Sequence, residues 1–175
     1  MLDLLPGGRR LSIRLSTHDY SANSAYFLTL CTYRRALFFG NILDGVVTLS
    51  PAGRIVRDLW VKTSEIRAGV ILDAFVIMPN HMHVIITMPD AVGRKPGSGP
   101  FQRAPGSLGA LVAGYKAACT SEVKRLVATT PLRLWQRNYY EHVIRNARAL
   151  AGMRRYIADN PARWRKPTFP RRPAD

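Results

Sequence analysis

The chain has 175 residues, of which 47% are hydrophobic, so it can bury the core of one globular domain. Lys and Arg number 26 against 11 Asp and Glu, which gives a formal net charge of +15. This excess favours a polyanionic partner, nucleic acid above all, because each neutralised phosphate releases condensed counterions. The chain contains no apolar run near the roughly 18 residues of a membrane span and does not open with a signal-peptide pattern. We therefore expect a cytoplasmic protein that binds nucleic acid and has no membrane partner, and whose Cys31 and Cys119 are buried thiols.

We expect one domain over residues 21–162, between a basic N-terminal arm (1–20) and a basic C-terminal tail (163–175). Aromatic and β-branched residues predict a first strand over 25–33, and a short apolar run predicts a second over 45–49. Ser50 followed by Pro51 is a typical helix start, and the apolar spacing continues to about residue 66.

Residues 70–78 and 81–88 are two apolar runs separated by Pro79 and Asn80, which predicts a hairpin or a bent ribbon. Residues 91–106 are rich in Gly, Pro and basic side chains and are expected to form a loop. Ser107 can cap a helix that runs to about residue 127, and a further strand (134–144) and helix (147–160) complete the pattern. The expected fold class is α+β: a ferredoxin-like (RRM-like) antiparallel sheet with helices packed mainly on one face.

Two histidines stand in the apolar strand predicted over 81–88. Because side chains alternate along a strand, His81 and His83 point to one face and Met82 to the other. Burying two imidazoles costs free energy unless their nitrogens have partners, and a divalent metal is one such partner. A pair of histidines on the solvated face of a sheet is the alternative that this motif alone leaves open.

The last predicted helix carries Tyr156 and Asn160, which lie one above the other because they are four residues apart. A phenol beside an amide suits a nucleophile placed next to a metal ligand, although a phenol with a pKa of about 10 needs activation. The alternative is that Tyr156 packs in the core and Asn160 ends the helix before Pro161.

Three segments carry a resemblance to a known family: 75–85 (FVIMPNHMHVI), 134–145 (LWQRNYYEHVIR) and 156–161 (YIADNP). In order and spacing they resemble the REP-associated tyrosine transposases, relatives of single-tyrosine insertion-sequence transposases among the HUH nucleases. The resemblance spans about residues 26–164 and includes Ser107-Leu108-Gly109 leading into Tyr115-Lys116 on the predicted middle helix.

The resemblance implies a metal-dependent single-stranded DNA endonuclease and strand transferase that acts at palindromic REP-type hairpins. His81, His83 and Asn160 match the ligands of one Mg²⁺ or Mn²⁺, and Tyr156 matches the nucleophile that takes the 5′ phosphate. The active form would be a monomer or a homodimer. Two alternatives remain: a hairpin-binding protein of the same fold without cleavage, and the transposase of an autonomous insertion sequence.

Tyr139 and Tyr140 are rival nucleophiles, but neither has an amide at helical spacing, and we expect them to pack or to stack on bases. His142 shares a strand face with Tyr140 and is expected to be structural or to touch DNA. The basic residues expected to guide DNA are spread over several elements: Arg34, Arg35, Lys116, Arg137, Arg145, Arg154 and Arg155.

Overall fold

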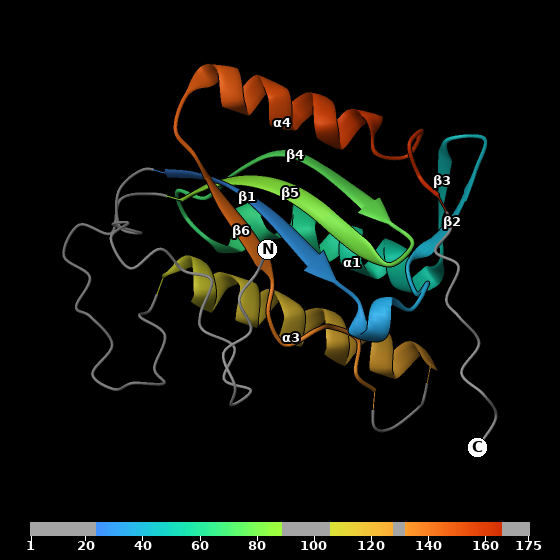
Figure 1. Cartoon of the computed structure of the whole chain (residues 1–175). Helices are drawn as coiled ribbons and strands as arrows, with labels where there is room; N and C mark the ends of the chain where they lie inside the picture. The colour runs from blue at the N-terminus through green and yellow to red at the C-terminus, as the bar shows by residue number, and fades with distance from the viewer. Residues whose placement is uncertain (1–23, 89–105, 128–131, 166–175) are drawn as a thin grey trace, which may run out of the picture.

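A computed structural model describes residues 24–88, 106–127 and 132–165. Its centre is a four-stranded antiparallel sheet in the order β4-β5-β1-β6 (Figure 1). The strands are β1 (Ser24–Cys31), β4 (Ile71–Met78), β5 (His81–Met88) and β6 (Tyr140–Ile144). A separate hairpin consists of β2 (Gly40–Leu43) and β3 (Val46–Leu49). The helices are α1 (Pro51–Val61), α2 (Thr63–Ile66), α3 (Leu108–Val127) and α4 (Ala147–Asp159), with a 3-10 turn η1 (Tyr33–Arg35) after β1.

Side-chain caps fix where the three long helices begin. The Ser50 side chain accepts a hydrogen bond from the Gly53 amide at 3.0 Å, directly before Pro51 at the first helical position. Ser107 accepts from the Ala110 amide at 3.2 Å, as the sequence predicts. Asn146 does the same for α4, accepting from the Ala149 amide at 2.8 Å. The start of α4, the helix that carries Tyr156, is therefore defined by a local polar contact.

The sheet separates two apolar layers, in agreement with the expected α+β class. Helices α1 and α3 cover one face and form the main core, which includes Leu28, Trp60 and Met82. Helix α4 lies on the opposite face (Figure 1), where Ile157 joins Phe27 and two isoleucines of the sheet in a smaller cluster. Most helical residues thus pack on one face as predicted, and the one helix on the other face carries the candidate nucleophile.

The structure differs from the predicted elements in three places. The apolar run at 45–49 pairs with β2, which was not predicted, through a turn in which Asp44 and Gly45 have positive φ angles of 49° and 75°. The helix expected over 51–66 is interrupted at Lys62, between α1 and α2. The strand expected over 134–144 is regular only from Tyr140, and before it Trp135 forms a single bridge to Thr32.

Both cysteines are buried and free, as expected. Within the described ranges, no helix has the length and apolarity that crossing a membrane requires. The N-terminal arm (1–20), nearly all of the expected loop at 91–106 and most of the tail (163–175) lie outside the described residues.

Candidate active site

The two histidines of β5 lie on the face of the sheet that α4 covers. Alternation along β5 places Met82 and Val84 in the main core, so His81 and His83 point to the other side. Both are buried, with 8% and 6% of their surfaces exposed. A solvated histidine pair is therefore excluded.

Each imidazole is held through its Nδ1 atom. His81 Nδ1 donates to the amide oxygen of Asn80 at 2.6 Å, and His83 Nδ1 is hydrogen-bonded to the Thr29 hydroxyl at 2.8 Å. Thr29 is the cross-strand neighbour of His83 on β1. Because an amide oxygen only accepts, the proton of neutral His81 is on Nδ1, and its Nε2 carries a lone pair that faces His83 Nε2 within hydrogen-bonding distance. Oxygen partners on the outer ring nitrogens are the usual support of metal-binding histidines.

The two Nε2 atoms face one another at 3.0 Å, and both rings are neutral near pH 7. Burial, with smaller effects of His83 and Arg35, lowers the pKa of His81 from 6.5 to about 3. Burial, with a smaller effect of Arg35, lowers the pKa of His83 to about 4. Metals bind the neutral form of imidazole, so burial holds both histidines in the protonation state that a cation requires.

The donor set fits a divalent metal. Neighbouring ligands of an octahedral ion, each about 2.1 Å from the metal, are about 3.0 Å apart, and the Nε2 atoms are separated by 3.0 Å. Among the described residues, no group of three or more His, Cys, Asp or Glu side chains could hold a metal. The remaining ligands would be amide, water or phosphate oxygens, which hard cations such as Mg²⁺ and Mn²⁺ accept.

Tyr156 lies beside His83, one member of this pair. Its ring centroid is 5.2 Å from that of His83 and 5.8 Å from that of Phe27, which itself stacks on His83 at 5.2 Å. The neighbouring Ile157 is buried in the smaller apolar cluster and anchors the helix. Tyr156 remains 43% exposed, so a strand of DNA could reach its hydroxyl.

Asn160 ends α4 in helical geometry, and its amide nitrogen donates a long 3.5 Å hydrogen bond to the Tyr156 carbonyl. The side chain therefore lies back along its own helix. Four residues later, the ring of Trp164 is 6.0 Å from that of His81. Tyr156 thus adjoins His83 and Trp164 adjoins His81, and Asn160 stands midway between Tyr156 and Trp164 in the chain. Its role as a metal ligand stays a prediction.

The rival tyrosines are placed differently. The register aligns His83, Thr29 and Tyr140 across three strands, so Tyr140 is on the same face but separated from His83 by the whole of β1. Tyr140 is 50% exposed at the edge of the sheet. Tyr139 points the other way and packs against the main core. Tyr156 is therefore the phenol that contacts the histidine pair.

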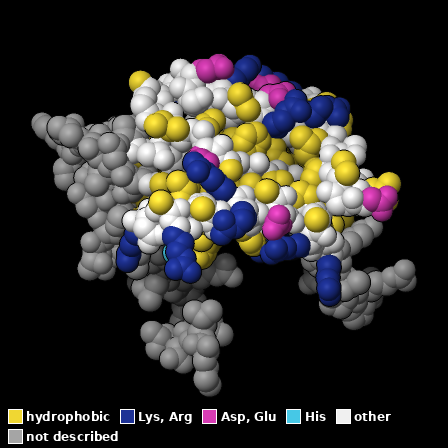
Figure 2. Space-filling model, turned by 90° about the horizontal axis from the view of Figure 1, so that it is seen from above, with side chains coloured by type: hydrophobic (Ala, Val, Ile, Leu, Met, Phe, Trp, Pro, Cys, Tyr) yellow, Lys and Arg dark blue, Asp and Glu magenta, His cyan; other side chains and the backbone are white. Residues whose placement is uncertain are grey.

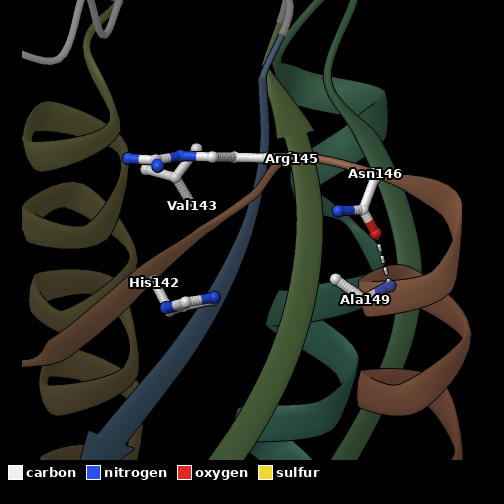
Figure 3. Close-up of a pocket in the computed structure, with 5 residues that line it drawn as sticks. All are labelled: His142, Val143, Arg145, Asn146 and Ala149. Atoms are coloured by element: carbon white, nitrogen blue, oxygen red, sulfur yellow. Dashed lines mark hydrogen bonds between the residues drawn. The ribbon is translucent and has the colours of Figure 1, made fainter.

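His142 lies near the start of α4 rather than at the histidine pair. Together with Val143, Arg145, Asn146 and Ala149 it lines a hollow of about 280 Å³ between β6 and α4 (Figure 3). Asn146 turns toward the helix that it caps, and Arg145 extends in the opposite direction (Figure 3). His142 is exposed, and neither a structural nor a DNA-binding role is decided by this position.

The basic residues expected to guide DNA differ in the contacts that they make in the structure. Arg34 and Arg35 form the exposed turn η1, close enough to the histidines for Arg35 to affect their pKa. Lys116 donates hydrogen bonds to the carbonyls of Gln136 (2.9 Å) and Asn138 (3.0 Å), so it braces the chain before β6. The three other exposed candidates, which form no salt bridge within the part of the chain that the structure describes, are Arg137, Arg145 and Arg155.

Arg154 forms a two-pronged ion pair with Asp73 of β4, which ties α4 to the sheet. The ion pair also lowers the pKa of Asp73, chiefly through the hydrogen bond from Arg154. Seen from the α4 side, basic side chains are spread across the face with a few acidic ones between them (Figure 2). That surface suits a polyanion, and the DNA contacts of individual arginines stay predictions.

Sequence reasoning missed three residues that shape the site: Thr29, Asn80 and Trp164. Asn80 is 3% exposed and adjoins His81 in the chain, so an amide beside the first histidine was the available signal. Thr29 and Trp164 reach the site only through strand pairing and the path of the chain after α4, and no local pattern marks them.

No protein-family model matches the chain. An uncharacterized protein of Haemophilus influenzae is 33% identical over 167 residues, which cover 89% of this chain and 89% of the relative. Among solved structures, a REP-associated tyrosine transposase bound to a REP hairpin is similar with a TM-score of 0.58 and 21% identity. The match covers 85% of this chain and 73% of that one. At this identity the likeness establishes the fold, and it confirms the sequence resemblance at that level.

Proposed function

We propose that this chain, which belongs to the same family as the Haemophilus influenzae protein and has the fold of a REP-associated tyrosine transposase, cuts and rejoins single-stranded DNA. The proposed reaction proceeds through a covalent 5′-phosphotyrosine. The observation that carries the proposal is the contact of the Tyr156 ring with His83, which faces His81 across 3.0 Å. Accessible phenols are common on proteins, but a phenol in contact with one of two buried imidazoles that face each other is a less common arrangement, and it supports phosphoryl transfer.

In this proposal His81 and His83 hold one Mg²⁺ or Mn²⁺ together with Asn160. When bound, the metal supplies charge stabilisation for the phosphate and a template for in-line attack. Asn80 and Thr29 orient the imidazoles through their Nδ1 atoms. Phe27, stacked on His83, excludes water from that side of the ring.

The chain supplies the nucleophile and its position. The Tyr156 oxygen forms a bond to phosphorus, the bond from phosphorus to the 3′ oxygen breaks, and the phenol loses its proton while the 3′ oxygen gains one. The 5′ end of the DNA then remains on Tyr156. A free 3′-hydroxyl can reverse the step, which would rejoin the same strand or transfer it to another.

The proposed substrate is single-stranded DNA with palindromic hairpins, because the solved structure of this fold holds a REP hairpin. The net charge of +15 suits such a partner. Arg35 is the cation that we place beside the reacting phosphate. Within the described residues it forms no salt bridge, and its charge reaches both histidines.

The test is a cleavage assay on a labelled single-stranded oligonucleotide that carries a palindrome from the source genome, with Mg²⁺ or Mn²⁺ or with EDTA. We expect a metal-dependent protein-linked fragment on a denaturing gel for the unaltered chain. Tyr156→Phe and His81→Ala should abolish it. Two matched controls, Tyr140→Phe and His142→Ala, change the same residue types on the same sheet face and should retain it.

Other outcomes are equally informative. If the covalent protein–DNA linkage survived Tyr156→Phe and disappeared in Tyr140→Phe, the nucleophile would be Tyr140 on the edge strand β6. Hairpin binding without cleavage of any such palindrome would favour a DNA-binding protein of the same fold. One observation is consistent with that second candidate: the Asn160 amide lies against its own helix.

A further inference from the structure

A second cluster of polar side chains lies where β1 ends, next to the histidine pair. The guanidinium carbon of Arg34 is 5.4 Å from the centre of the Tyr33 ring, and that of Arg133 is 5.6 Å from it. Chain pairing brings these groups together, because the Tyr33 amide donates to the Leu134 carbonyl at 2.9 Å. Arg133 therefore reaches Tyr33 from a segment a hundred residues away in the chain.

The cluster gathers positive charge without a carboxylate. Within the described residues, neither Arg34 nor Arg133 forms a salt bridge with Asp or Glu, and neither does the adjacent Arg35. The guanidinium of Arg133, followed by that of Arg34, lowers the pKa of the Tyr33 phenol. Two cations held on one ring repel each other, so an anion that binds between them would be stabilised.

The backbone of the cluster is strained. Arg34 and Arg35 have φ angles of 53° and 57°, in the left-handed region that costs free energy for residues other than glycine. Such conformations persist where the surrounding structure imposes them, and they concentrate at ligand sites. Glycine would adopt these angles at a lower cost, so the two arginines stand at positions that the backbone does not favour.

The turn is also joined to the proposed active site. Cys31 is the cross-strand partner of His81, and the Thr32 amide donates to the Asn80 carbonyl at 3.0 Å. Tyr33 follows directly. A DNA strand whose phosphate lay at the histidine pair would therefore have its neighbouring phosphates within reach of this turn.

We propose that Tyr33, Arg34 and Arg133 form a subsite that binds a backbone phosphate of the DNA strand, next to the phosphate cleaved at the histidine pair. The guanidinium groups donate to the phosphate oxygens, and the ring of Tyr33 holds them at a fixed spacing. The subsite rests on the proposed function in one respect: its ligand is the same DNA strand. It does not require cleavage.

Binding is measured for the full chain with Tyr156→Phe, in EDTA, so that chemistry cannot contribute. Anisotropy of a labelled single-stranded hairpin oligonucleotide gives the affinity at several salt concentrations. Arg34→Gln with Arg133→Gln should weaken binding about tenfold and reduce the slope of log affinity against log salt by about 0.7 for each phosphate lost. Arg57→Gln with Arg125→Gln removes the same charge from arginines already paired with carboxylates and should change neither.

The variant Arg34→Gly distinguishes an effect on DNA binding from an effect on folding stability. Glycine relieves the left-handed strain, so the unfolding midpoint should stay equal or rise while DNA affinity falls. A lowered midpoint with unchanged affinity per folded molecule would show a purely structural turn and overturn the subsite. A series of oligonucleotides, each with one phosphate replaced by an uncharged methylphosphonate, should contain a position at which the replacement weakens binding to the chain with the intact subsite. The same replacement should not weaken binding to the double variant.

The two proposals fail in different ways. If the chain with the intact subsite binds no hairpin DNA at any salt concentration, the proposed function and its subsite both fail. If it binds and the double variant has the same affinity and salt slope, only the subsite is refuted.

Discussion

The position of Tyr156 depends on the packing of α4 against the sheet, and Ile157→Ala tests this dependence. Ile157 is the one fully buried residue of α4, at 4% exposure, and it packs on Phe27, Ile85 and Ile144. The substitution removes three carbons, worth about 2.4 kcal/mol at about 0.8 kcal/mol each before any cavity cost. If that loss falls on docking of α4, the undocked population rises about 50-fold, because 1.4 kcal/mol is a factor of ten.

We expect the substitution to loosen α4 and to leave the rest of the domain intact. Amide hydrogen exchange should accelerate in α4 while the strands under α1 and α3 remain protected, because the main core lies on the other face of the sheet. Covalent linkage to DNA should fall strongly, and hairpin binding should change little. The matched control is Ile77→Ala, an equally buried isoleucine of the main core, which should destabilise the whole domain.

Two results would refute this reasoning. If amide hydrogen exchange accelerated equally in α4 and in the sheet, α4 would not be a separate cooperative unit. Unchanged linkage per folded molecule, despite an undocked α4, would mean that Tyr156 reaches the phosphate without the anchor.

Three further predictions concern the histidine pair and the packing of α1. Thr29→Val removes the hydroxyl at His83 Nδ1 with little change of shape and should weaken Mn²⁺ binding about 10- to 100-fold by calorimetry. In the metal-free chain the pKa values of His81 and His83 are depressed, so the unfolded state binds more protons than the folded state below pH 6.5. The free energy of unfolding should therefore fall from pH 6.5 toward 4, by up to about 1.4 kcal/mol per pH unit per histidine. Urea midpoints check this, and a variant with Gln at both positions should lose the slope. Gly53→Ala would place a Cβ 2.0 Å from the Phe39 carbonyl oxygen and should lower the free energy of unfolding by about 1–3 kcal/mol in a urea titration; an unchanged midpoint would contradict the packing.

Features set by neighbouring residues were predictable from the sequence. Strand alternation placed His81 and His83 on one face, and helical spacing stacked Tyr156 above Asn160. The caps at Ser50 and Ser107 are local in the same way. These patterns depend on residues within a turn or two, which is why a single sequence reveals them.

Features set by distant residues required the tertiary structure. The strand order brings Thr29 to His83, and pairing of the chain before β6 with the end of β1 brings Arg133 to Tyr33. The sequence also could not choose the face for α4, because an amphipathic helix fits either side of a sheet whose two faces both carry apolar residues.

The sequence by itself therefore determined which residue types could carry the chemistry and on which element each one stands. Only the tertiary structure decided that Tyr156, rather than Tyr140, contacts His83. The physical reason is that a side chain's direction follows from its local backbone, whereas contact between elements depends on burial of apolar surface from the whole chain. For α4 that surface is the small cluster of Phe27, Ile85, Ile144 and Ile157, whose members come from four separate elements.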